Sequence, residues 1–348
     1  MWIYQARRER PMLDAAALHA DATVVDAHSD VFCDVARRRL LGETSILNRL
    51  HVPAWREGGV NVVITTMYTE PEHKPDRALR RAMTLLGAGL NDIDETPDVS
   101  MCRTRAEIDP TVAAGRIAFV LAMEGGEPIQ ESVDALRVFY GMGMRVLGLT
   151  WNQRNLLAEG VGEERANGGL TELGREVVAE ANRLGILLDC SHLSVRSFWD
   201  LVETSTKPVI ASHSNAKALC GHRRNLDDDQ MRALVATGGI IGINGVADFI
   251  TDDGNDASLD RMLDHVDYII GLAGTEHVAL GPDFVDYLRV GPDTRERHMD
   301  IVYPEGFETI RSMPNVTAGL VARGYDESSI RAILGDNMLR LLDTVMKG

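Results

Sequence analysis

The sequence alternates short apolar runs with longer amphipathic stretches, and this alternation constrains the fold more than any other feature. The apolar runs fall near residues 23–28, 60–67, 117–124, 144–150, 185–191, 208–213, 239–244 and 277–283. Stretches with helical periodicity lie between them, among them 76–90, 131–143, 171–185 and 258–274. Strands that alternate with helices form parallel sheets, so eight such repeats predict an α/β fold, a closed (β/α)8 barrel of the TIM type.

Length and composition fit one domain. The chain has 348 residues, of which 45% are hydrophobic, and no linker or low-complexity tract divides it. We therefore expect a single catalytic barrel over residues 1–348, closed by helical segments from Pro314 to the end. The segment 287–307 is too long for an ordinary connection, and we expect it to cover the mouth of the barrel.

Charge and the N-terminal sequence limit the partners and the location. A net charge of -16 opposes binding to nucleic acid or anionic lipid, so the predicted partners are small molecules. The first 22 residues lack the apolar core of a signal peptide, and no run is long enough to cross a membrane, which predicts a cytoplasmic protein. The four cysteines are widely spaced, which indicates neither a disulfide scaffold nor a zinc ribbon.

Side chains that bind metals stand at the ends of five of the apolar runs. They are His28, Asp30, Glu124, His192, His213 and Asp283. In a parallel barrel the carboxyl ends of the strands meet at one mouth, so these side chains would converge in space. Zinc binds histidine nitrogen and carboxylate oxygen, and a hydrolytic site keeps one coordination position open for water. Three histidines with two or three carboxylates are enough for two ions.

Each of these residues, taken singly, has a simpler interpretation. His28 with Asp30 could be a core histidine and a loop aspartate, and Glu124 could cap a helix or form a salt bridge. His192 and His213 could be satisfied core histidines. The recurrence at five strand ends favours the metal site, with Asp189 and the neighbouring serines orienting the imidazoles.

Five motifs, in order along the chain, resemble those of the membrane (renal) dipeptidase family, the M19 zinc peptidases, which are amidohydrolase-like metal-dependent hydrolases. These motifs are DAHSD at 26–30, AMEGG at 122–126, DCSH at 189–192, ASHS at 211–214 with RRN at 223–225, and GPDF at 281–284. The similarity covers essentially the whole chain, including ILGDNMLRLL near its end.

The resemblance implies a dipeptidase with two zinc ions bridged by Glu124. One ion would also be held by His28 and Asp30, and the other by His192 and His213. A water molecule between the ions would attack the peptide bond. Some related hydrolases bridge their ions with a carbamylated lysine, but none of the four lysines, Lys74, Lys207, Lys217 and Lys347, stands at the end of a predicted strand.

The resemblance also assigns the substrate contacts. Asp283 would act as general acid and base, and Arg224 would bind the terminal carboxylate of the dipeptide. His222 is interpreted as structural. Tolerance of a D-residue at the carboxyl side is expected, and the family pattern is compatible with a homodimer.

One position departs from the family. Relatives have a substrate-contacting histidine after the fourth strand, whereas GLTWNQRN places Trp151 and Asn152 there. Either Asn152 or the zinc ions alone polarise the carbonyl, or the substrate is another small amide, carbamate or lactone. A catalytically silent ligand-binding barrel is the alternative outside enzymes. Tyr68, Phe249 and Tyr287 also fall near predicted strand exits, where they would line the pocket or pack the loops.

Overall fold

Eight parallel strands form a nearly closed barrel. The computed structural model describes residues 13–163, 165–289 and 301–346. The strands pair in the order β1-β2-β4-β5-β6-β7-β8-β9, and β9 lies in contact with β1. They are β1 Val24–Ser29, β2 Val60–Tyr68, β4 Ile117–Glu124, β5 Met144–Gly148, β6 Leu187–Asp189, β7 Val209–Ala211, β8 Ile240–Ile243 and β9 Val278–Leu280. The predicted (β/α)8 barrel is confirmed.

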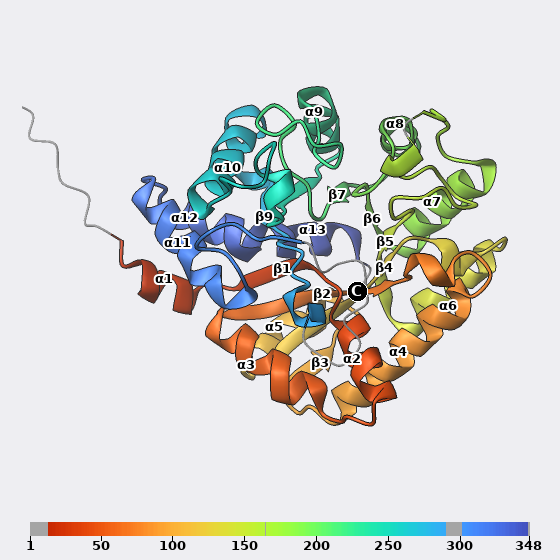
Figure 1. The fold of residues 1–348 in the computed structure, drawn as a ribbon, viewed down its shortest axis with the longest axis horizontal. Helices are drawn as coiled ribbons and strands as arrows, with labels where there is room; N and C mark the ends of the chain where they lie inside the picture. The colour runs from red at the N-terminus through yellow and green to blue at the C-terminus, as the bar shows by residue number, and fades with distance from the viewer. Residues whose placement is uncertain (1–12, 164, 290–300, 347–348) are drawn as a thin grey trace, which may run out of the picture.

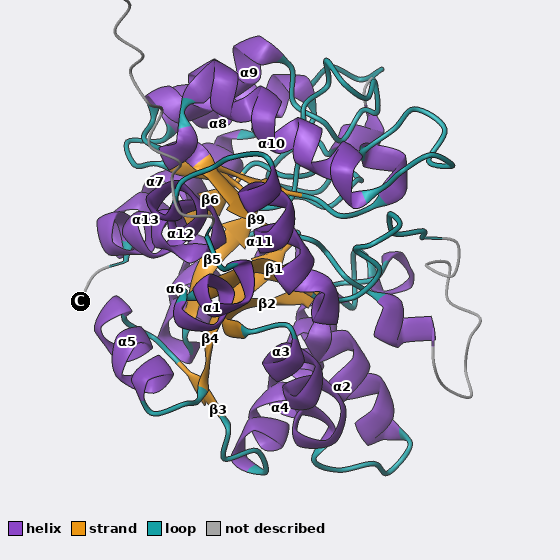
Figure 2. Cartoon of the chain, turned by 90° about the vertical axis from the view of Figure 1, so that its left-hand side faces the viewer, coloured by secondary structure: helices purple, strands orange, loops and turns teal. Residues whose placement is uncertain are grey.

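Helices surround the strands (Figures 1 and 2). They are α1 Ala15–Asp21, α2 Val31–Leu40, α3 Val52–Glu57, α4 Ala78–Asp94, α5 Arg105–Ala113, α6 Val133–Met142, α7 Glu172–Leu184, α8 Val195–Thr204, α9 Asp228–Ala236, α10 Leu259–Ala273, α11 Met313–Ala322, α12 Glu327–Arg331 and α13 Asn337–Val345. The side chains of Thr171 and Ser194 cap α7 and α8, and left-handed glycines, Gly143 and Gly185, end α6 and α7. None of the helices in the described ranges is long and apolar enough to span a membrane.

One strand was missed by the sequence pattern. β3, Val99–Met101, pairs with the first residues of β4, Ile117–Phe119, whereas β5 pairs with the later residues of β4. A strand of three residues is too short to show a period, so it could not be recognised before its partner was known.

The apolar core consists of two clusters of buried residues. The cluster inside the barrel shows which end of the barrel is closed. Inside the barrel, residues such as Val25, Val62 and Ile210 pack against Met338 and Leu342 of α13. The Asn337 amide at the start of α13 donates to the Val278 carbonyl, at the start of β9. Helix α13 therefore closes the amino end of the barrel and leaves the carboxyl ends of the strands for the functional site.

The remaining sequence expectations concern the C-terminal third and the cysteines. Helices α12 and α13 are joined by a π-helical turn, Ala332–Asp336, so the chain closes with two helical segments, α11 and the joined pair. The expected cover over the mouth falls mostly on residues 290–300, outside the described residues. The four cysteines are buried and free.

Candidate metal centre

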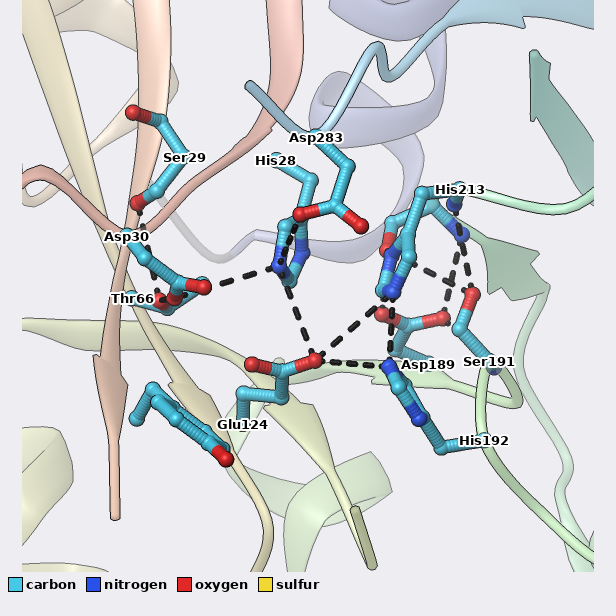
Figure 3. Close-up of polar contacts among 12 residues, drawn as sticks. His28, Ser29, Asp30, Thr66, Glu124, Asp189, Ser191, His192, His213 and Asp283 are labelled. Atoms are coloured by element: carbon cyan, nitrogen blue, oxygen red, sulfur yellow. Dashed lines mark hydrogen bonds and ion pairs between the residues drawn. The ribbon is translucent and has the colours of Figure 1, made fainter. Parts of the chain in front are cut away.

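The six predicted metal-type residues meet at the carboxyl end of the barrel (Figure 3). They come from five strand ends: His28 lies in β1 and Asp30 follows it, Glu124 ends β4, and His192, His213 and Asp283 follow β6, β7 and β9. All are buried except Asp283, which is partly exposed. The structure therefore brings together side chains that are more than 250 residues apart in sequence.

Glu124 is at the centre of the cluster. Its Oε1 atom lies 2.8 Å from His192 Nε2, 3.6 Å from His28 Nε2 and 3.6 Å from His213 Nε2. His28 Nε2 also lies 3.9 Å from a carboxylate oxygen of Asp30 and 3.9 Å from one of Asp283. Two overlapping groups could each hold an ion, namely His28 with Glu124 and His213, and His28 with Asp30 and Asp283.

Hydrogen bonds define the tautomer of His213. The Ser212 hydroxyl donates to Asp189 Oδ2 at 2.5 Å, and it lies 2.6 Å from His213 Nδ1. Because a hydroxyl has one proton and Asp189 takes it, Ser212 accepts from Nδ1 of His213. The Nε2 atom of His213 therefore presents a lone pair to the cluster. Asp189 and Ser212 have the orienting role expected from the sequence.

Asn152 defines the tautomer of His192 in the same way that Ser212 defines that of His213. Its Oδ1 atom accepts from His192 Nδ1 at 2.9 Å, so Nε2 of His192 also presents a lone pair. The two Nε2 atoms face each other across 2.9 Å. Two lone pairs this close need a cation between or beside them. The sequence predicted that Asn152 contacts the substrate. The structure shows in addition that Asn152 contacts His192, a candidate metal ligand.

The electrostatics of the cluster also fit a metal. Burial, reinforced by the Arg224 charge, lowers the pKa of His192 to about 3, and burial lowers that of His213. Burial opposes protonation of His28, but Glu124, Asp30 and Asp283 raise its pKa to about 10. Its Nε2 is buried, and no residue in the described ranges forms a hydrogen bond with it. His192 and His213 are therefore neutral imidazoles beside buried carboxylates, the form in which histidine binds zinc, whereas His28 would exchange its proton for the metal ion.

Asp283 is held in a strained conformation beside the cluster. Its φ is 60°, and that of His192 is 69°; positive φ is uncommon outside glycine, and residues that adopt it cluster at active sites. Asn244 Nδ2 donates to Asp283 Oδ2 at 3.3 Å, and the Tyr303 hydroxyl donates to the Asp283 carbonyl at 2.8 Å. Burial raises the pKa of Asp283, which suits a group that exchanges protons. The sequence pattern did not identify Asn244 or Tyr303.

A cavity of about 340 Å³ opens over the cluster, and the predicted substrate residues line it. They are Arg224, Trp151 and Asn152, joined by Tyr68 and Phe249. Arg224 is buried and donates to the His213 carbonyl at 3.3 Å, whereas its neighbour Arg223 is exposed.

Two other residues lie in places that the sequence did not indicate. His222, interpreted as structural, stacks on Phe249 with ring centroids 4.4 Å apart and lines the same cavity. Tyr287 does not line it. Instead it packs edge-on against His51, 5.1 Å between centroids, in a separate cavity.

The hydroxyl of Ser212 gives a test of the ligand set. Replacing Ser212 by alanine removes the acceptor that holds His213 Nδ1, and we expect metal affinity to fall by roughly 10- to 100-fold. Competition with a chromogenic chelator would measure this. Ser214→Ala is the matched control, because the Ser214 hydroxyl is buried and hydrogen-bonds to no residue in the part of the chain that the structure describes. Equal affinities of the two variants would contradict the role of Ser212.

The barrel and the histidine–carboxylate cluster at its mouth define a metal-dependent hydrolase. A family model described as membrane dipeptidase (peptidase family M19) matches residues 12–347. The chain belongs to this family and is a metal-dependent dipeptidase by that membership.

Relatives and solved structures agree with the family. An uncharacterized dipeptidase of Schizosaccharomyces pombe is 30% identical over 347 residues, which covers 92% of this chain and 80% of that protein. A metallopeptidase from Rhodobacter sphaeroides, liganded with a phosphinate mimic of L-Ala-D-Ala, is 28% identical with a TM-score of 0.81, covering 93% of this chain and 99% of that one. The M19 metallopeptidase dipeptidase AC is also 28% identical, with a TM-score of 0.83 and coverage of 94% and 99%.

Proposed function

We propose that this protein is a binuclear zinc dipeptidase that hydrolyses small dipeptides, including those with a C-terminal D-residue. The observation that carries the proposal is the buried cluster around Glu124 Oε1, onto which three imidazole nitrogens converge within 3.6 Å. In this proposal His28 and Asp30 would hold one ion, His192 and His213 would hold the other, and Glu124 would be a ligand of both. The phosphinate bound to the Rhodobacter sphaeroides relative mimics an L,D-dipeptide, which supports the D-residue.

The residues of this chain divide the work of peptide hydrolysis. Two zinc ions at the cluster would activate a water molecule and polarise the scissile carbonyl. Asp283 takes the proton of the attacking water and delivers it to the leaving amine. Arg224 binds the terminal carboxylate of the dipeptide. The Asn152 amide, whose oxygen is bonded to His192, has its Nδ2 group left to donate to the oxygen on which negative charge develops.

Hydrolysis of paired L,L- and L,D-dipeptides tests the proposal directly. Protein reconstituted with zinc should hydrolyse members of both series, and a chelator-stripped sample should lose the activity and regain it with zinc. Metal analysis should find two equivalents per chain in the active sample. Two bound ions without hydrolysis of any dipeptide would overturn the proposed substrate.

A second substrate class is favoured by one residue. Trp151 occupies the position where relatives have a substrate-contacting histidine, and its ring lies 5.9 Å from that of His192. If N-acyl amino acids, carbamates or lactones were hydrolysed faster than free dipeptides, the protein would be a zinc hydrolase of another small amide or ester.

A further inference from the structure

A buried ion pair lies behind one wall of the substrate cavity. Lys74 Nζ is 3.0 Å from Glu127 Oε1, and the two side chains are only 10% and 4% exposed. Among the described residues, neither charged group forms a hydrogen bond. Taking two charges out of water is costly, and their attraction repays the cost only partly. Further favourable contacts of the two charged groups are therefore needed to explain why the pair is buried here.

The ammonium group of Lys74 lies near two aromatic rings. Its Nζ atom is 5.4 Å from the centre of the Trp151 ring and 5.7 Å from that of Tyr68. The two rings are themselves 5.4 Å apart. Cations within about 6 Å of an aromatic centroid are attracted to its face, most strongly for tryptophan and most strongly where water is excluded.

The rings and the ion pair belong to different cavities. Tyr68 and Trp151 line the cavity over the metal cluster, whereas Lys74 and Glu127 line a neighbouring cavity of about 930 Å³. The two rings therefore form a wall, which we call the Tyr68–Trp151 wall, with the cation outside the substrate cavity. Lys74 cannot touch the substrate there, but it contacts residues that line the substrate cavity.

The ion pair joins three loops at the barrel mouth. Lys74 follows the short helix Pro71–His73 after β2, Glu127 begins a short helix after β4, and Trp151 follows β5. Gly125, with φ 87°, makes this arrangement fit: a Cβ there would lie 2.4 Å from Glu127 Oε2 and 3.3 Å from the Trp151 backbone nitrogen. Among the described residues, one short helix, Val161–Glu163, lies between Trp151 and α7, so the Trp151 side chain depends on contacts from other loops.

We propose that Lys74 is a positioning residue of the dipeptidase site. Its ammonium group, fixed by Glu127, holds the Tyr68–Trp151 wall in the orientation that shapes the substrate cavity. The ion pair is neutral overall, so it orients the rings without adding net charge beside the metal ligands. This inference rests on the proposed function, since it concerns how that substrate is held.

The decisive variant is Lys74→Met, which keeps the length and apolar contacts of the side chain and removes its charge. We expect KM for a dipeptide to rise about tenfold, with little change in kcat and unchanged metal content. Affinity for a phosphinate dipeptide analogue should fall by the same factor. Lys74→Arg, which keeps a cation, should restore both. Lys207→Met is the matched control, because Lys207 is exposed and lies before β7.

A double-mutant cycle separates positioning from general stability. If Lys74 acts through the indole, Trp151→Leu should raise KM by itself, and adding Lys74→Met should raise it no further. If the KM increase of the double variant equalled the product of the increases of the two single variants, the proposal would be overturned. A wild-type KM in Lys74→Met would overturn it as well. Glu127→Gln provides a second variant, in which KM should rise in the same direction because the ammonium group loses its anchor.

Fluorescence tests the positioning without any substrate. The Trp151 signal is the difference between a protein and its Trp151→Phe counterpart, and Lys74→Met should make this signal easier to quench with acrylamide. Unchanged quenching would overturn the inference even if dipeptides are hydrolysed. Suppose that Lys74→Met increases the quenching but the wild-type protein hydrolyses no dipeptide. The role of Lys74 in positioning Trp151 would then stand, and the proposed substrate would be wrong.

Discussion

Replacing Asp283 by asparagine should lower kcat by about 10³-fold while the metal content stays at the wild-type level. The amide has the same shape as the carboxyl group and keeps an oxygen for the Asn244 contact, but it cannot accept the proton of the attacking water. General acid–base groups contribute on the order of 10²- to 10⁴-fold to rate. Steady-state hydrolysis of one dipeptide, with metal analysis of the same sample, measures both quantities.

Asp248→Asn is the matched control, because Asp248 is exposed and lines the same cavity without being part of the cluster. It should change kcat little. Loss of one ion in Asp283→Asn would make Asp283 a metal ligand, as its 3.9 Å distance from His28 Nε2 allows. Full activity would remove it from the acid and base role.

Replacing Glu124 by glutamine should cost both metal and activity. Glu124 Oε1 lies within 3.6 Å of the Nε2 atoms of all three histidines, and a neutral amide has one oxygen acceptor where the carboxylate has two. We expect the bound metal to fall below the wild-type content by at least one equivalent, and kcat/KM to fall by at least about 10³-fold. Metal analysis after gel filtration and dipeptide hydrolysis are the measurements.

Glu131→Gln is a suitable comparison, because it makes the same chemical change at an exposed position shortly after β4. It should keep the wild-type metal content and rate. A Glu124→Gln protein that bound two ions and turned over normally would show that Glu124 does not bridge them, and the assignment of the other ligands to two ions would fail with it.

The barrel and the metal-type cluster were predictable from the sequence because both follow from local patterns. An apolar run that ends in a histidine or carboxylate predicts a strand and places that side chain at its carboxyl end or just beyond it, as at His28, Glu124 and Asp283. Parallel strands then bring those ends together without any further information. The match to the M19 family confirms the resemblance that the motifs indicated.

Contacts between loops could not be predicted in this way. The Lys74–Glu127 pair joins loops after different strands, and neither residue belongs to a periodic segment. The hydrogen bond of Asn152 to His192 depends on how a loop after β5 meets one after β6. The single-domain organisation, a homodimer and a cytoplasmic location remain predictions from the sequence.

The closure of the barrel by α13 has a consequence for how the chain folds during synthesis. Val25, in the first strand, and Met338 and Leu342, in the last helix, belong to one apolar cluster. More than 300 residues separate Val25 from Met338 in the sequence, so the barrel interior stays incomplete until α13 has been synthesised. Strand β1, which carries His28, therefore lacks its apolar partners in α13 while the intervening residues are made.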